Sequence, residues 1–241
     1  MTTRQVVESN GEGFSPTQLL DVRGRTQSAL MEIAGAVAPG MSEHDARLMA
    51  ADVLRARGLR KGWHKILVRF GVNTLMNFGD PSEPGVILGQ DDIFFIDIGP
   101  VFRGHEGDAG DTFVVGGDAD MVQAASDVHT LWHQVRGAWI NQSASGADLY
   151  RIASMRAEEM GWNLNLDLTG HRISAFPHRV HFDGSLSDVG FAPSDLLWVL
   201  EIQIRHPIRP FGAFFEDLLL HDPVAQSLPR VVERTSVTPR T

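Results

Sequence analysis

A chain of 241 residues with a formal net charge of −9 and no cysteine excludes several classes of protein. The acidic balance, with no cluster of Lys and Arg, argues against nucleic acid as a partner. The lack of cysteine excludes disulfides, thiolate zinc sites and iron–sulfur clusters. No run of about 18 apolar residues is present, so we expect no membrane span. The length fits one domain with a large core, and we take residues 1–241 as that domain.

Four helices are predicted, in two pairs. The first pair is 17–37, by its apolar spacing, and a helix that Ser42 caps and that runs to about Arg57, before a glycine. The second pair is 120–141 and 149–160, separated by a Ser- and Gly-rich break. Strand-like segments follow each pair, so the chain reads as helix–helix–strands twice. This order predicts an α+β fold of two similar halves, with one antiparallel sheet buried under four helices.

Five strand-like segments, otherwise rich in Ile, Phe, Val and Leu, each carry an acid or a histidine. A carboxylate in such a run is costly to bury unless a positive charge meets it. Any one of these acids is equally well explained as a helix cap or a surface ion pair, but four acids and a histidine together favour a metal site. The segments are 93–99, 107–115, 170–173, 198–202 and 214–220, and the residues are Asp97, Asp108, His171, Glu201 and Glu216.

The type and number of these groups predict the metal. Carboxylates and imidazole are hard-to-borderline ligands that suit Mn²⁺, Co²⁺, Fe²⁺ or Zn²⁺. One divalent ion would leave about two buried negative charges unbalanced, each costing several kcal/mol. Two divalent ions would balance all four acids, so we predict a dinuclear centre. A pair of ions that share one water lowers the pKa of that water and so supplies a hydroxide for attack on a carbonyl.

The same residues resemble the pita-bread superfamily of methionine aminopeptidases, prolidases, aminopeptidases P and creatinase. Asp97 and Asp108 have the family's separation of eleven residues (108 − 97 = 11). The segment 170–173, Gly-His-Arg-Ile, resembles the family's Gly-His-x-Ile segment, and Phe-Pro-His at 176–178 resembles the stretch after it. The last two Glu segments also match, and the resemblance covers roughly residues 20–235.

The resemblance implies a pita-bread fold with two pseudo-symmetric halves and a curved antiparallel sheet covered by helices. It implies that Asp97 binds one ion, that His171 and Glu201 bind the other, and that Asp108 and Glu216 bridge them. The implied activity is that of an Xaa-Pro aminopeptidase or dipeptidase, in which a hydroxide between the ions attacks a peptide or small amide carbonyl. By family habit the chain is expected to form a homodimer.

Further residues have implied or candidate roles near this centre. His178 matches the family histidine that contacts the substrate carbonyl and the developing oxyanion. A second family histidine, upstream of the first Asp, has no counterpart between residues 70 and 97, and His64 is the candidate to replace it. Arg172 is a candidate for binding a substrate carboxylate or pairing with an acid, and His206 for reaching the mouth of the cleft. Asp217 and Asp111, each near a ligand segment, are candidates for orienting the ligands.

Three functions remain open from the sequence. The first is the dinuclear hydrolase of a peptide or small amide. The second is a different metalloenzyme on the same fold, which hydrolyses another C–N bond or uses Fe or Co for oxygen chemistry on a small acid. The third is a peptide-binding module without catalysis, which the full set of five ligands disfavours. The chain resembles the short, single-domain form of the family, and with no basic-then-apolar leader we expect a cytoplasmic location.

Overall fold

The structure is a computed structural model that describes residues 2–59 and 61–221. Its main sheet is antiparallel, in the order β2-β3-β6-β10-β9-β7, with β8 paired to β9. These strands are β2 Leu67–Phe70, β3 Asp92–Ile98, β6 Ala109–Val115, β7 Asn163–Leu164, β8 His171–Arg172, β9 Trp198–Arg205 and β10 Gly212–Leu218. The part of the predicted domain at 222–241 lies outside the described residues.

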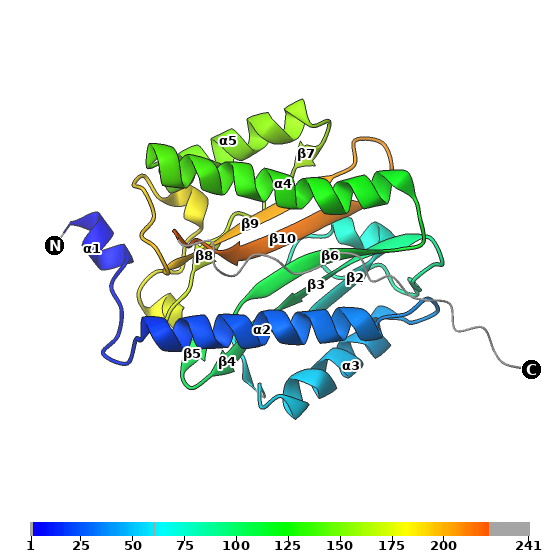
Figure 1. Ribbon diagram of the computed structural model, residues 1–241, viewed down its shortest axis with the longest axis horizontal. Coiled ribbons are helices and arrows are strands. Elements are labelled where there is room, and N and C mark those ends of the chain that lie inside the picture. The colour runs from blue at the N-terminus through cyan, green and yellow to red at the C-terminus, as the bar shows by residue number, and fades with distance from the viewer. Residues whose placement is uncertain (1, 60, 222–241) are drawn as a thin grey trace, which may run out of the picture.

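Two long helices, α2 and α4, run across one face of this sheet (Figure 1). Each packs on a second helix, α3 on α2 and α5 on α4, and a short helix α1 precedes them. The bounds are α1 Thr3–Val7, α2 Pro16–Ala36, α3 Glu43–Ala56, α4 Ala119–Gln142 and α5 Gly146–Glu159. The predicted α+β fold with four helices over an antiparallel sheet is confirmed.

The helices begin where the sequence provides a cap. The side chains of Ser15, Ser42 and Ser145 each accept a hydrogen bond from the backbone N–H three residues later, which satisfies one of the free donors of the first turn. α5 begins at Gly146, three residues before the predicted start, because Ser145 caps it inside the segment expected to be a break. Helix α1 was not predicted.

Each half of the molecule has its own apolar core between its helix pair and its strands. In the first half Leu30 and Ile33 of α2 pack with Phe94 and Ile96 of β3. In the second half Trp132 of α4 is fully buried, packs with Leu200 of β9 and donates from its indole N–H to the carbonyl of that residue at 2.8 Å. The halves join where β6 pairs with β10, at the centre of the sheet.

Two acids beside the ligand segments hold the helices against the sheet. Asp217 of β10 forms a buried ion pair with Arg23 of α2, and Asp111 of β6 lies 2.6 Å from the imidazole Nε2 of His129 on α4. Both acids therefore contact the helix-covered face and not the ligand side. The sequence made both acids candidates for orienting the ligands, and in the structure their side chains contact the helices that cover the sheet.

A small second sheet and three short 3₁₀ segments complete the fold. Its strands are β1 Lys61–Gly62, β4 Pro100–Phe102 and β5 His105–Glu106, in the order β1-β4-β5. The 3₁₀ segments are η1 Gly71–Leu75, η2 His178–Val180 and η3 Leu186–Asp188. The pairing of β1 with β4 brings the segment after β1 next to the end of β3, where Asp97 lies. None of the described helices is long and apolar enough to cross a membrane.

Candidate metal centre

Three of the predicted ligands form a row across the middle of the sheet. Asp97 pairs with Gly110 on β6, Gly110 pairs with Glu216, and Glu216 pairs with Glu201. Directly paired residues project from the same face of a sheet, so the three carboxylates share one face. A Cβ at Gly110 would lie 2.9 Å from Oε1 of Glu216 and 2.2 Å from the ring of Phe214. Glycine at this position therefore leaves room between the carboxylates.

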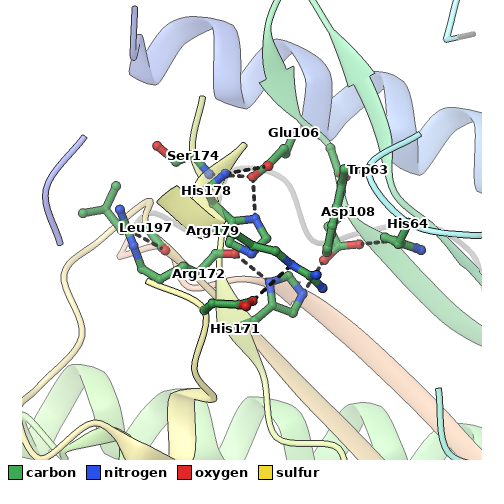
Figure 2. A network of polar contacts seen from close by, with 12 residues as sticks. Trp63, His64, Glu106, Asp108, His171, Arg172, Ser174, His178, Arg179 and Leu197 are labelled. Atoms are coloured by element: carbon green, nitrogen blue, oxygen red, sulfur yellow. Dashed lines mark hydrogen bonds and ion pairs between the residues drawn. The ribbon is translucent and has the colours of Figure 1, made fainter. Parts of the chain in front are cut away.

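Asp108 and His171 complete the cluster from outside the row. Asp108 lies immediately before β6, and Nε2 of His171 is 2.9 Å from its Oδ2 (Figure 2). The same Nε2 is 3.6 Å from Oε1 of Glu201. The Nδ1 of His171 lies 2.7 Å from the carbonyl oxygen of Arg172 and donates to it, which fixes the ring and presents Nε2 to the acids. The structure thus brings together all five residues that the sequence singled out.

The cluster fits divalent cations by its chemistry. All four acids are buried, and among the described residues Oδ2 of Asp108 and Oε1 of Glu216 have no hydrogen-bond donor. The contact of His171 with Asp108 is within ion-pair distance but lacks the geometry of a hydrogen bond. Buried carboxylate oxygens without donors are costly. Two groups of ligand atoms, each within 4.8 Å of one another, are able to hold an ion: His64, Asp97 and Asp108, and then Asp108, His171 and Glu216.

The pKa values of three of the four acids are raised, as expected where buried negative charges lie close together. Burial, with the charges of Asp108 and Glu201 added, raises the pKa of Asp97 to about 7. Burial also raises the pKa of Glu201 and, with the neighbouring acids, puts that of Glu216 well above its usual value. Asp108 is the exception: burial works against ionisation, but His171 and His64 hold its pKa below the usual value. Without a cation, the cluster therefore favours protonated acids over four free carboxylates.

His64 enters this centre from the segment after β1. Its Nε2 lies 3.3 Å from Oδ1 of Asp108 and 3.5 Å from Oδ1 of Asp97. Its side chain is 6% exposed, and although burial works in the other direction, the charge of Asp97 and the contact with Asp108 raise its pKa to about 9. The sequence left open whether His64 reaches the site. The structure brings it there, whereas its chemical role stays a prediction.

His178 packs against His171 and contacts Glu106, an acid that the sequence analysis did not select. The rings of the two histidines are stacked, with centroids 5.6 Å apart. Glu106 of β5 is 1% exposed; its Oε2 lies 2.9 Å from Nδ1 of His178 and its Oε1 accepts from the backbone N–H of the same residue at 2.9 Å (Figure 2). Glu106 lies two residues before Asp108, and this proximity to a ligand was the available signal in the sequence.

A cavity of about 370 Å³ opens over the ligands. Its apolar wall includes Trp63, whose ring lies 4.3 to 5.2 Å from the rings of three histidines: His64, His171 and His178. Phe78 and Leu168 also line it, and Arg179 is a cation on its wall. Trp63, Phe78 and Arg179 were not selected from the sequence, because the courses of their loops have no periodic signal.

Two predicted substrate contacts are wrong in this structure. Arg172 is fully buried, and its guanidinium donates to the carbonyl oxygens of Leu197 and Ser9 and to Oδ1 of Asn10. Its side chain points toward Leu197 and away from Asp108 (Figure 2). His206 lies beyond the end of β9, where its Nδ1 accepts from the backbone N–H groups of the β9–β10 turn. Neither residue is among those that line the cavity.

Comparison with known proteins identifies the family. The model of metallopeptidase family M24 matches residues 18–222. The chain belongs to this family. The M24 family uses divalent metals, which agrees with the donor set described above. No curated protein matches the chain at a significant level.

Solved M24 structures share the pita-bread fold with this chain, so that prediction is confirmed. An X-Pro aminopeptidase from Thermotoga maritima superposes with a TM-score of 0.72 at 18% identity, over 95% of this chain and 66% of its own. A prolidase from Pyrococcus horikoshii gives 0.68 at 15%, over 90% and 62%. A methionine aminopeptidase from Thermotoga maritima gives 0.65 at 17%, over 86% and 94%. The chain therefore spans a little under two thirds of the first two relatives and almost all of the third.

Proposed function

We propose that this M24 chain is a dinuclear metal-dependent hydrolase that cleaves a peptide or another small amide. The observation that carries the proposal is the convergence of Asp97, Asp108, His171, Glu201 and Glu216 on one face of the sheet, with two buried carboxylate oxygens left without donors. Two divalent ions, drawn from Mn, Co, Fe and Zn, would be held by these residues, with Asp108 and Glu216 shared. Bound there, such ions supply an activated water and a polarised carbonyl.

The remaining side chains prepare the cavity for a carbonyl substrate. Glu106 accepts from Nδ1–H of His178, which leaves Nε2 of that ring free to contact a substrate oxygen. Because Glu106 also accepts from the backbone N–H of His178, it fixes both the imidazole ring and the first residue of η2 before substrate binds. This arrangement supports the predicted role of His178 at the carbonyl.

The walls of the cavity favour a small substrate with an apolar part and an acidic end. Trp63, Phe78 and Leu168 give an apolar surface, and the volume of about 370 Å³ suits a dipeptide-sized molecule. Arg179 replaces Arg172 as the candidate for a substrate carboxylate, because it lines the cavity and its side chain is 64% exposed. Its ion-pair partner among the described residues, Asp183, is 3.2 Å away and also largely exposed, so a ligand is able to compete for Arg179.

One feature favours a second function, hydrolysis of a C–N bond other than a peptide bond. The segment where the family's peptidases have an upstream histidine places Phe78 in the cavity, against the ring of His64. Loss of a proton donor to the leaving amine typically lowers the rate by about 10² to 10⁴. An amide with a better leaving group than an amine of a peptide would depend less on such a donor.

The test is a metal analysis followed by a substrate screen. Protein purified without chelator is expected to carry close to two divalent ions per chain, and with added Mn²⁺ or Co²⁺ to cleave members of a dipeptide library that includes Xaa-Pro bonds. If the chain binds metal but cleaves no peptide, its substrate would be another small amide. A chain that binds no metal at all would refute the hydrolase. The homodimer and the cytoplasmic location stay predictions from the sequence.

A further inference from the structure

Two histidines flank Asp108 in matching ways. His171 approaches Oδ2 at 2.9 Å and His64 approaches Oδ1 at 3.3 Å, each through Nε2. Each also has its Nδ1 at 2.7 Å from the carbonyl oxygen of the next residue in the chain, Arg172 for His171 and Lys65 for His64. The two imidazoles thus make matching contacts, one with each oxygen of Asp108.

The backbone contact decides which ring nitrogen of His64 is available. A carbonyl oxygen only accepts, so Nδ1 must carry the proton in the bond to Lys65. In the neutral ring Nε2 then presents a lone pair toward Asp97 and Asp108. A lone pair facing carboxylate oxygens is repulsive unless a positive charge lies between them, which is a proton in the metal-free site and the metal ion when the site is filled. Donation of the second N–H to a backbone carbonyl is also what metal-binding histidines show in general.

The surroundings of His64 hold the ring in that place. A Cβ on Gly99 would lie 2.0 Å from the imidazole and 2.6 Å from the indole Nε1 of Trp63, so only glycine leaves room for this pair. Trp63 packs edge-on against His64 and donates from its indole N–H to the carbonyl of Gly107 at 2.8 Å. The imidazole is therefore fixed by packing on one side and by Lys65 on the other.

The distances suit a shared cation. Two donor atoms at about 2.0 to 2.2 Å from one ion lie about 2.8 to 3.6 Å apart, the shorter separations in octahedral and the longer in tetrahedral geometry. The separations of 3.3 and 3.5 Å from Nε2 of His64 to the oxygens of Asp108 and Asp97 fall in this range. For a hydrogen bond to an ionised carboxylate they are long, since such bonds are about 2.7 to 2.9 Å.

We propose that His64 is a sixth protein ligand of the dinuclear centre, coordinating through Nε2 the ion that Asp97 and Asp108 hold. Each ion then has one imidazole, His64 on one side and His171 on the other. The inference rests on the proposed function for the presence of two ions but not for the reaction. It also means that His64 is not the replacement proton donor, because both of its ring nitrogens are engaged.

A nitrogen ligand on each ion changes the metal that the site prefers. Imidazole suits Zn, Cu, Fe and Ni, whereas sites of carboxylate, carbonyl and water suit Mg, Ca and Mn. We therefore expect His64 to shift selectivity from Mn²⁺ toward Zn²⁺. Replacing His64 should lower the affinity for Zn²⁺ by about tenfold or more and alter that for Mn²⁺ less.

The experiment counts imidazoles by X-ray absorption at the zinc edge, on the full chain loaded with two equivalents of Zn²⁺. The wild type is expected to show an average of one imidazole per zinc. His64→Ala and His171→Ala should each show half of that, and the double variant none. His44→Ala is the matched control, because His44 is an exposed imidazole on α3, and it should keep the wild-type count.

Each outcome decides the inference. A wild type with half an imidazole per zinc, or a His64→Ala chain with an unchanged count, overturns it and leaves the hydrolase intact. One imidazole per zinc in a chain that hydrolyses no substrate supports the inference and refutes the hydrolase. A chain that retains no zinc refutes both. The wild-type count requires no variant, and His64→Gln, which keeps a polar side chain of similar reach, serves as the second variant if His64→Ala does not fold.

Discussion

Arg23 of α2 and Asp217 of β10 form the most buried arginine–carboxylate ion pair of the described residues, and its removal should destabilise the protein. Their side chains are 6% and 3% exposed, and Nε of Arg23 donates to Oδ1 of Asp217 at 2.7 Å. Arg23→Met would leave Asp217 buried with the backbone N–H of Leu218 at 2.7 Å and the amide of Gln27 at 3.3 Å. Asp217 follows the ligand Glu216 directly, so this pair also sets how β10 lies on α2.

The magnitude follows from this geometry. Leaving one partner of a buried pair uncompensated costs about 3 to 5 kcal/mol, and because two donors to Asp217 remain we expect about 3 kcal/mol. For a domain of this size that lowers Tm by about 6 to 12 °C. The assay is thermal and urea unfolding in the presence of chelator, so that metal binding does not contribute.

A second arginine on the same helix provides the control. Arg25 pairs with Asp21 at 3.0 Å, but the two side chains are 45% and 40% exposed. Arg25→Met should therefore change the free energy of unfolding by no more than about 1 kcal/mol. Adding Asp217→Asn to Arg23→Met should restore part of the loss, because the uncompensated charge is then gone. Equal unfolding free energies for Arg23→Met and Arg25→Met would refute the reasoning.

Four further predictions concern the metal centre. In metal-free protein the pKa of Asp97 is raised to about 7, so folding favours its protonated form and its contribution to stability falls as pH rises from about 4 to 7. The pKa of His171 is raised to about 10, so its contribution to stability is full below about pH 6.5 and is lost as pH rises through 10. Since metal binding needs both groups deprotonated, the rise in Tm on adding Zn²⁺ should be larger at about pH 8.5 than at about pH 5.5, and a smaller rise at the higher pH would contradict this. Glu216→Gln should lower the metal content from two ions toward one, measured by elemental analysis, while a full complement of metal would exclude its bridging role. Glu106→Gln should lower kcat by about tenfold or more with metal content unchanged, because His178 loses its charged partner. An unchanged kcat in a steady-state hydrolysis assay would show that the pair of Glu106 and His178 is structural only. Gly110→Ala should cost about 1 to 3 kcal/mol in urea unfolding, because its Cβ would meet the rings and oxygens described above, and a variant of wild-type stability would mean that the row has more room than the structure gives it.

The ligand positions were predictable because each combines a local pattern with a charge. Asp97, Glu201 and Glu216 stand in apolar runs that form β3, β9 and β10, and a buried acid in such a run has few explanations. Which acids face each other was not predictable from the pattern alone. Glu216 meets Gly110 across a pairing of strands more than 100 residues apart, and that register follows from the packing of both halves.

The two wrong substrate contacts have different causes, and the first is the alternation of side chains along a strand. Neighbouring residues of a strand project to opposite faces. Arg172 follows the ligand His171 directly and so leaves the ligand face, whereas His206 lies in the turn after the end of β9, too far along the chain from Glu201 to reach the ligands. Asp217 beside Glu216 follows the same rule. Counting positions from each ligand would have excluded Arg172 and Asp217 from the ligand face without a structure.

His64 could not be placed by that rule, since it lies in the irregular segment between β1 and β2. Its presence nevertheless leaves the argument for two ions unchanged. Two divalent cations balance four carboxylates, and a neutral imidazole adds a donor atom without adding charge. As an imidazolium, by contrast, His64 would supply one of the positive charges itself and favour fewer ions. The number of ions and the number of imidazoles are thus linked in this site, and a chain that binds two zinc ions is the one in which His64 is free to bind as a neutral ligand.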